Sequence, residues 1–344
     1  MKRPALLTET DTLPEGILDV SARELHTLLD GPTLVHLPGR RPEPLFVSVL
    51  LHGNEDTGLL AVQQLLAKHA ERELPRALSI FFGNVSAARE GLRRLDGQPD
   101  YNRCWPSTEL PESDETRMMR YVVDAMRERG VFASVDVHNN TGLNPHYACV
   151  NKLDNAYLQL ATLFGRTVVY FIRPRGVASM AMAELCPATT LECGKPGQSH
   201  GVEHAVEYLD ACLHLSEIPS HAVSEHDIDL FHTVAQVKVP DEFSFAFGHS
   251  AAHIVFDREL ERMNFREVPP GTEFGATDPR SDAHLVAYNE AGEDVTDEFF
   301  EITDQRILLK RRMMPSMLTM NERVVRQDCL CYLMERLDLE AARE

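Results

Sequence analysis

The sequence predicts an α/β fold, in which a sheet covered by helices on both faces precedes a smaller, β-rich part. Two observations lead to this prediction. Short apolar runs alternate with longer segments that carry apolar residues at helical spacing through the first part of the 344-residue chain. After about residue 222 the helical segments largely disappear, and short strand-like runs separated by Gly, Pro and Asp take their place.

In the first part, the apolar runs predict strands and the periodic segments predict helices. Thr57–Glu71 has apolar residues at helical spacing, and Asp114–Arg129 has acidic residues in its first turn and arginines in its last. Val131–Val137 is a continuous apolar run, typical of a strand buried on both faces. The expected strands are 33–37, 45–51, 77–82, 131–137, 167–172 and 188–192. The expected helices are 57–71, 114–129, 154–164 and 199–215.

The second part is expected to be a β-rich domain that begins somewhere within Glu217–Asp229. We therefore divide the chain into residues 1–222 and 223–344. The expected strands here are 231–239, 243–247, 253–256 and 307–309, and one late helix is expected over 323–337. Residues 1–15 are expected to be a polar lead-in.

The composition excludes several kinds of partner. The net charge is −19, with 53 acidic and 34 basic residues, so a nucleic acid or an anionic membrane is not expected as the main partner. A local cluster of arginines can still bind a small anion. The seven cysteines are scattered, which indicates a reducing, cytoplasmic setting without a disulfide framework. No signal peptide and no membrane-spanning helix are expected.

Potential metal ligands follow two of the predicted strands. The strand over 45–51 leads into His52-Gly53-Asn54-Glu55, and the strand over 131–137 leads into His138. Two histidines and one glutamate form a ligand set typical of catalytic zinc, which leaves a fourth position open. In α/β sheets, such sites lie at the carboxyl ends of strands. His52, Glu55 and His138 are therefore predicted to bind one Zn²⁺ per chain.

A second motif offers an alternative. The segment from His200 to His204 reads H-G-V-E-H and matches the H-x-x-E-H signature, in which both histidines bind zinc and Glu203 is the base. However, Gly201 weakens a helix at this turn, and no further acidic ligand stands out downstream. The other interpretation is that both histidines lie on the solvated face of a covering helix.

The order of the motifs resembles a known family. The segments are H52-G-N-E55, G83-N84, D100-Y-N-R103-C-W, D136-V-H138-N-N-T-G and T190-L-E192-C-G194. Together they are similar to the zinc carboxypeptidase superfamily, and within it to the succinylglutamate desuccinylase/aspartoacylase branch. The resemblance covers residues 45–200 and implies a three-layer α/β/α zinc-hydrolase domain with a mixed central sheet, followed by the β-rich domain.

The resemblance also implies roles for individual residues. Glu192 would be the general base that takes a proton from water and passes it to the leaving nitrogen. Asp100 would orient the imidazole of His52 without binding the metal itself. Asn102 and Arg103 would bind a carboxylate of the substrate, for which a guanidinium is suited in shape and charge.

An arginine in Arg93-Arg94 would polarise the scissile carbonyl in this resemblance. We favour Arg93, and Arg94 remains the alternative. His146 is read either as a residue that faces the site or, preferably, as a structural residue at the start of a strand.

The sequence departs from aspartoacylase where that enzyme holds the second carboxylate of its substrate. Ala178 and Met182 stand about where a tyrosine and an arginine are sought, and Arg173 and Arg175 are offset. N-acetylaspartate is therefore not expected as the substrate. No tyrosine occurs between Val295 and Arg312, where the family's late tyrosine is sought.

The predicted function is a zinc-dependent amidohydrolase that cleaves an amide bond of a small, anionic, carboxylate-bearing substrate, such as an N-acyl amino acid. The alternatives are a metallocarboxypeptidase acting on short peptides and a non-catalytic, metal-binding regulatory module. The set of potential ligands together with Glu192 favours the enzyme.

Overall fold

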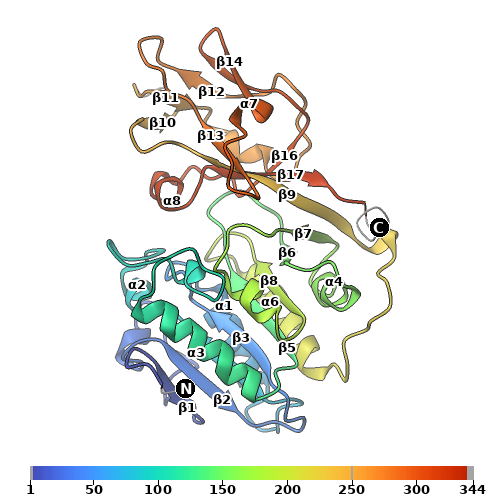
Figure 1. Ribbon diagram of the computed structural model, residues 1–344. Helices are drawn as coiled ribbons and strands as arrows, with labels where there is room; N and C mark the ends of the chain where they lie inside the picture. The colour runs from blue at the N-terminus through green and yellow to red at the C-terminus, as the bar shows by residue number, and fades with distance from the viewer. Residues whose placement is uncertain (1–2, 249–250, 339–344) are drawn as a thin grey trace. The chain divides into compact units, whose positions relative to one another are not determined.

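The computed structural model describes residues 3–248 and 251–338, and they form two compact units. Of the described residues, unit 1 comprises those within 1–139 and 146–230, and unit 2 comprises those within 140–145 and 231–344. The chain therefore leaves unit 1 after Asn139, contributes six residues to unit 2, and returns at His146. Figure 1 labels helices and strands of both units. Nothing in the sequence pattern indicated this exchange.

Unit 1 contains a mixed sheet in the order β1-β2-β4-β3-β5-β8-β6-β7. The pairs β1–β2, β3–β4, β3–β5, β5–β8 and β6–β7 are parallel, and β2–β4 and β6–β8 are antiparallel. The strands are β1 (Thr8–Thr10), β2 (Thr33–Leu37), β3 (Leu45–Val49), β4 (Leu78–Phe82), β5 (Ala133–His138), β6 (Tyr147–Val150), β7 (Thr167–Tyr170) and β8 (Ala188–Glu192). Every residue of β3, β5 and β8 is buried. For β5 this confirms the buried strand that the run over 131–137 predicted.

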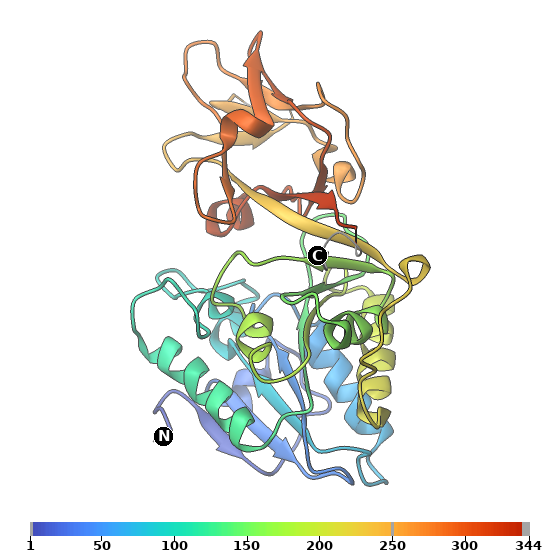
Figure 2. The same ribbon diagram turned by 45° about the vertical axis from the view of Figure 1, so that its right-hand side comes forward.

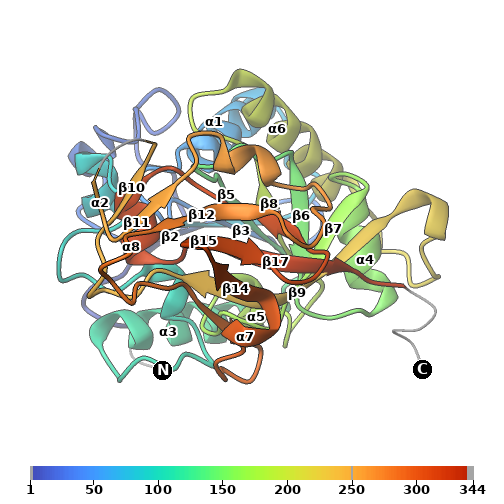
Figure 3. The same cartoon turned by 90° about the horizontal axis from the view of Figure 1, so that it is seen from above.

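Helices cover both faces of this sheet, so the predicted three-layer arrangement is confirmed (Figure 3). They are α1 (Thr57–Lys68), α2 (Val85–Glu90), α3 (Asp114–Glu128), α4 (Asn155–Thr162), α5 (Ala178–Met182) and α6 (Ser199–His214), with short 3₁₀ turns η1 (Leu25–Thr27) and η2 (Tyr101–Arg103). Figure 2 shows α1 and α6 side by side, and α3 and α5 lie on the other face of the sheet.

Helix α3 illustrates how the local sequence makes these helices. Ser113 and Thr116 form a reciprocal capping box at its start, where the Ser113 hydroxyl accepts from the Thr116 amide at 3.2 Å and the Thr116 hydroxyl accepts from the Ser113 amide at 2.8 Å. Its apolar side chains occupy one stripe and pack against the sheet residues Phe46 and Phe81 and against Trp105. The members of this stripe are Met118, Met119, Val122, Val123 and Met126.

The short strand β1 is held in place by buried and partly buried polar side chains, although its sequence was expected to be a polar lead-in. Glu9 accepts from Tyr121 Oη at 2.7 Å and lies 3.0 Å from Nε2 of His36, whose Nδ1 lies 2.8 Å from Oγ of Ser79. We refer to these four residues as the Glu9 network. Three polar residues carry too little pattern to predict a strand, and pairing with β2 supplies the missing order.

Unit 2 is rich in strands, as expected. Strand β9 pairs antiparallel with β13 and β17, and β16 pairs with β17, while β10-β11-β12-β15-β14 form a five-stranded sheet. The bounds are β9 (Asp229–Lys238), β10 (Phe245–Phe247), β11 (Ile254–Phe256), β12 (Glu273–Thr277), β13 (Val286–Asn289), β14 (Phe300–Thr303), β15 (Arg306–Leu309), β16 (Met314–Ser316) and β17 (Cys331–Arg336). The turns and helices are η3 (Glu225–Asp227), which precedes the unit, η4 (Leu260–Met263), α7 (Thr296–Phe299) and α8 (Glu322–Gln327).

The predicted helix over 323–337 is wrong. Helix α8 ends at Gln327, Asp328 leaves helical geometry at φ −136° and ψ −84°, and Cys331–Arg336 form β17. The apolar residues of this stretch fit helical spacing, but pairing of β17 with β9 and β16 overrides that local preference.

Candidate metal centre

The site lies where three strands of unit 1 end. Strands β3, β5 and β8 are parallel neighbours, so their carboxyl ends meet at one edge of the sheet. His52 and Glu55 follow β3, His138 is the last residue of β5, and Glu192 is the last residue of β8. Open α/β sheets characteristically place their sites at this edge.

A tight turn carries His52 and Glu55 from β3 to α1. Leu50 adopts a positive φ of 56°, which is uncommon for a residue other than glycine. At Gly53 an added Cβ would lie 2.1 Å from the amide nitrogen of Ala88 in α2, so only glycine fits between the turn and that helix. The Glu55 amide donates to the His52 carbonyl at 3.1 Å, which closes the turn.

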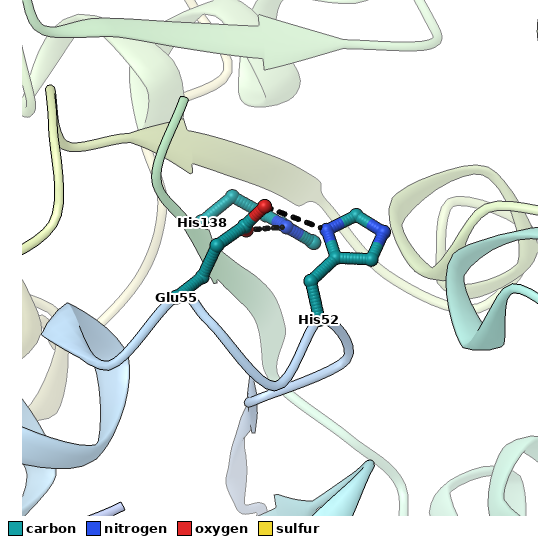
Figure 4. A group of neighbouring side chains, drawn as sticks. All are labelled: His52, Glu55 and His138. Atoms are coloured by element: carbon teal, nitrogen blue, oxygen red, sulfur yellow. Dashed lines mark hydrogen bonds and ion pairs between the residues drawn. The ribbon is translucent and has the colours of Figure 1, made fainter. Parts of the chain in front are cut away.

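Three potential ligand atoms converge at this edge (Figure 4). Oε1 of Glu55 lies 2.9 Å from Nδ1 of His52, and Oε2 lies 2.7 Å from Nδ1 of His138. One atom from each residue lies within 4.8 Å of the other two, and all three residues are buried. Among the described residues this is the group of three His, Cys, Asp or Glu side chains that could hold a metal ion.

Carboxylates hold the outer nitrogens of both imidazoles. Nε2 of His52 lies 3.1 Å from Oδ1 of Asp100, and Nε2 of His138 lies 2.8 Å from Oδ2 of Asp136. Asp136 also accepts from the Ser48 hydroxyl at 2.7 Å. A carboxylate on the far nitrogen fixes the tautomer that leaves Nδ1 bare, which is the usual support of a metal-binding histidine.

The charges of this cluster suit a dication. Three carboxylates (Glu55, Asp100 and Asp136) and one guanidinium (Arg93) leave a charge of −2 when the two histidines are neutral. Burial alone would raise the pKa of Glu55, but the imidazoles of His52 and His138 outweigh it and hold this pKa well below its usual range. The donor set and its charge therefore fit a divalent ion such as Zn²⁺.

The same surroundings shift the pKa of His138 in the opposite direction. Burial alone would lower its pKa, but Asp136 and Glu55 raise it well above the usual 6.5. The site thus favours a positive charge beside His138, and a metal ion can supply that charge in place of the proton.

Of the two candidate arginines, Arg93 borders the cluster. Its Nε and Nη2 donate to Oδ2 of Asp100 at 3.1 and 3.0 Å, and its Nη1 lies 3.9 Å from Oε1 of Glu55. Arg94 donates instead to the carbonyl of Gln98 at 2.8 Å.

Asn102 and Arg103 lie in η2, close to the cluster. Nδ2 of Asn102 lies 3.2 Å from Nε2 of His138, and its Oδ1 accepts from the Ala178 amide at 3.0 Å. The Arg103 guanidinium donates to the Asn102 carbonyl at 2.8 Å. Gly176 packs against this turn with a φ of +75°, and a Cβ there would lie 2.4 Å from the Arg103 carbonyl oxygen.

Glu192 is buried and lies beside His138. The two residues are register partners in the parallel pair of β5 and β8, so their side chains leave the sheet on the same face. On the other side, Tyr147 of β6 is the register partner of Glu192. Glu192 therefore lies at the same edge of the sheet as His138.

The alternative H-x-x-E-H motif does not join this cluster. His200 and His204 lie on α6, where their rings stack on His146 instead, and the cluster of potential ligands comprises His52, Glu55 and His138. Residue His146 immediately precedes β6, as the preferred interpretation expected.

Two contributors were missed from sequence. Asp136 was not predicted to take part in the site, although its i, i+2 spacing from His138 on a strand places both side chains on one face. Asn139 donates its amide to Oε2 of Glu55 at 3.1 Å and its side chain to the Gly194 carbonyl at 2.9 Å. The sequence does not indicate the role of Asn139, because that role depends on how β5 and β8 lie together.

Comparison with known families bears on this site. Residues 44–204, which contain all the potential ligands and Glu192, match the model of the succinylglutamate desuccinylase/aspartoacylase catalytic domain. This stretch of the chain therefore resembles that catalytic domain. The family resemblance inferred from the motifs is therefore confirmed.

Solved structures of the family share the fold over most of the chain. Succinylglutamate desuccinylase from Chromobacterium violaceum is 17% identical, with a TM-score of 0.57 over 87% of this chain and 86% of that chain. The enzyme of the same name from Vibrio parahaemolyticus is 13% identical, with a TM-score of 0.58 over 88% and 84%. Murine aminoacylase 3 is 15% identical, with a TM-score of 0.55 over 87% and 96%.

Two further findings concern this chain. A search of curated proteins gave no match. Within the described residues, none of the helices has the length and apolar character needed to cross a membrane.

Proposed function

We propose that this protein is a zinc-dependent amidohydrolase that removes the acyl group from an N-acyl amino acid. The observation that carries the proposal is the arrangement of His52, Glu55 and His138. Nδ1 of both histidines faces the Glu55 carboxylate, while Nε2 of each lies against an aspartate. That is how a protein holds a zinc ion with an open position for chemistry.

A bound zinc ion would supply Lewis acidity and lower the pKa of a water molecule at the open position. The protein's own part in the reaction is proton transfer. Glu192, beside His138 on the neighbouring strand, accepts the proton of the attacking water on its carboxylate. It then delivers that proton to the amide nitrogen that leaves.

Two cationic groups orient the substrate in this proposal. Arg93 stabilises the negative charge that develops on the scissile carbonyl oxygen, and its Nη1, 3.9 Å from Glu55, already borders the ligand set. Asn102 and Arg103 bind the carboxylate of the amino acid, which is the group that every N-acyl amino acid offers.

Helix α5 and the loop before it limit the choice of substrate. Ala178 and Met182 lie buried in α5, and the Ala178 amide is bound to Asn102. Arg173 is held by Glu109 through contacts of 3.1 and 2.9 Å. Since no cationic side chain stands at 178 or 182, we expect amino acids with uncharged side chains to be preferred over N-acyl aspartate.

The test is metal analysis followed by a substrate screen. We expect one zinc per chain, and release of amino acid from N-acetyl, N-formyl or N-succinyl amino acids but not from short peptides. His52→Ala should lose both the metal and the activity. Glu192→Gln should keep its zinc and lose at least about 100-fold in kcat, as expected for removal of a general base.

A matched control is Glu203→Gln, since Glu203 is an exposed glutamate on α6. It should retain full activity. Cleavage of peptides alone would instead establish a carboxypeptidase, and zinc binding without turnover of any substrate would favour a regulatory module. Retention of both zinc and activity by His52→Ala would refute the assigned site.

A further inference from the structure

The buried side chain of Asn139 joins segments of unit 1 that carry residues of the candidate site. Asn139 directly follows β5. Its Nδ2 donates to the Gly194 carbonyl at 2.9 Å, and its Oδ1 accepts from the Thr57 amide at 3.3 Å. A carbonyl can only accept and an amide N–H can only donate, so these two partners fix the direction in which the carboxamide points.

The hydrogen-bonded ladders of the sheet stop before they reach these segments. The register of β3 with β5 ends at the pair of Ser48 and Asp136, before the turn that carries the first two ligands. The register of β5 with β8 ends at His138 and Glu192, and one further bond follows, from the Cys193 amide to the His138 carbonyl at 3.0 Å. Beyond these points, strand pairing no longer sets the spacing between the segments.

Asn139 connects the segments on both sides of β5. Toward β3, its backbone amide donates to Oε2 of Glu55 at 3.1 Å, and its Oδ1 accepts from the first amide of α1. Asp56, which precedes α1, makes no side-chain cap of its own, so Asn139 takes the place of that cap. Toward β8, its Nδ2 holds the carbonyl of Gly194, two residues after Glu192.

We propose, on the basis of the function proposed above, that Asn139 is a positioning residue that holds the general base Glu192 at the correct distance from the ligand-bearing turn. Glu192 and the turn come from different strands, and one side chain hydrogen-bonded to the segments that carry both resists their separation. A general base must lie within about 2.6–3.2 Å of the group whose proton it takes. A displacement of about 1 Å can reduce the rate about 100-fold.

The metal ligands should not depend on this side chain. The contact of residue 139 with Glu55 comes from its backbone amide, which every substitution except proline retains. The carboxylates against the outer nitrogens of His52 and His138 belong to other residues. A variant at position 139 is therefore expected to keep its zinc, which separates an effect on the base from an effect on the metal.

The experiment measures steady-state kinetics of zinc-loaded Asn139→Ala and Asn139→Asp with the N-acyl amino acid that the wild type cleaves fastest. Asn139→Ala removes both side-chain hydrogen bonds. Asn139→Asp can still accept from the Thr57 amide, but it places an oxygen against the Gly194 carbonyl. We expect both variants to retain one zinc per chain and to lose about 10–100-fold in kcat. KM should stay within about twofold in Asn139→Ala, because the lost interaction acts in the transition state and not in substrate binding.

Asn151 offers a matched control. It is also buried, and its Nδ2 donates to the Phe171 carbonyl at the same distance of 2.9 Å. It follows β6, which runs antiparallel to β8, so it lies near the start of β8 and away from Glu192. Asn151→Ala should lower the unfolding temperature about as much as Asn139→Ala does, while leaving kcat unchanged.

The proposal is overturned if folded, zinc-loaded Asn139→Ala retains the kcat of the wild type, or if Asn151→Ala loses as much kcat as Asn139→Ala. Loss of zinc from Asn139→Ala would also overturn it, because the side chain would then act through the metal. If Asn139→Ala does not fold, the kcat of Asn139→Asp decides in the same way. A wild type that cleaves no N-acyl amino acid refutes the proposed function and this role together, whereas an active wild type beside an equally active Asn139→Ala refutes this role alone.

Discussion

Replacing Asp136 with asparagine tests the metal centre without touching a proposed ligand. Asp136 is fully buried at the end of β5, where it lies 2.8 Å from Nε2 of His138 and accepts from the Ser48 hydroxyl at 2.7 Å. Asparagine has the same shape, so it can keep one oxygen toward either partner. It loses the negative charge that orients His138 and increases the basicity of its Nδ1.

We expect Asp136→Asn to bind zinc 10–100-fold more weakly, the range typical for such outer carboxylates. This corresponds to about 1.4–2.7 kcal/mol of binding free energy. The assay is competition with a chromophoric chelator at pH 7.5, alongside thermal unfolding of the metal-free protein. Because the change is isosteric, the unfolding temperature without metal should change little.

Asp124→Asn is the matched control, since Asp124 lies on α3 and pairs with Arg127. Its zinc affinity should equal that of the wild type. If Asp136→Asn binds zinc within twofold of the wild type while remaining folded, His138 is not oriented through Nε2 as the structure indicates, and the argument for zinc on its Nδ1 fails.

Three further outcomes follow from contacts described above. Arg93→Ala should reduce kcat at least about tenfold, because a charge beside the reacting carbonyl is lost, whereas Arg94→Ala should leave steady-state kinetics unchanged; equal effects would contradict the assignment. Gly176→Ala should raise KM more than it changes zinc content, because its methyl group would meet the Arg103 carbonyl at 2.4 Å; an unaltered KM would show that this turn is not tightly held. Burial alone would raise the pKa of Glu9, but hydrogen bonds within the Glu9 network lower it below 4.5, so Glu9 contributes stability above pH 4.5 that is lost as the pH falls through the lowered value. Glu9→Gln should therefore reduce the free energy of urea unfolding at pH 7 and by less at pH 4, and an equal loss at both values would argue against the ionised form.

The sequence contained enough to predict the α/β layers and the ligand-bearing turns. Buried strands of a parallel sheet are recognisable as near-continuous apolar runs. Strand β3 is such a run, whereas β5 and β8 mix apolar residues with polar ones that are also buried. Once their carboxyl ends are placed at one edge, the residues that follow them must lie together. His52, Glu55 and His138 do so.

What escaped prediction depends on pairing between distant segments. The stretch 323–337 has apolar residues that fit helical spacing, but Cys331–Arg336 form β17, because β9 offers them a partner. The pairing of His146 with His204 escaped for the same reason, since 58 residues separate them in sequence. A local sequence pattern indicates which side chains a segment can bury, but it does not indicate which other segment that segment will pair with.

The six-residue excursion after Asn139 has a consequence for how this protein can be divided. Asn140–Pro145 belong to unit 2, where the Thr141 and Thr319 hydroxyls lie 2.7 Å apart and the Asn144 side chain accepts from the Met317 amide at 2.9 Å. A single cut near residue 230 would therefore remove the partners of a segment that begins two residues after His138. Swapping unit 2 between relatives would require exchanging both stretches together. We expect natural recombination between relatives to have exchanged both stretches together.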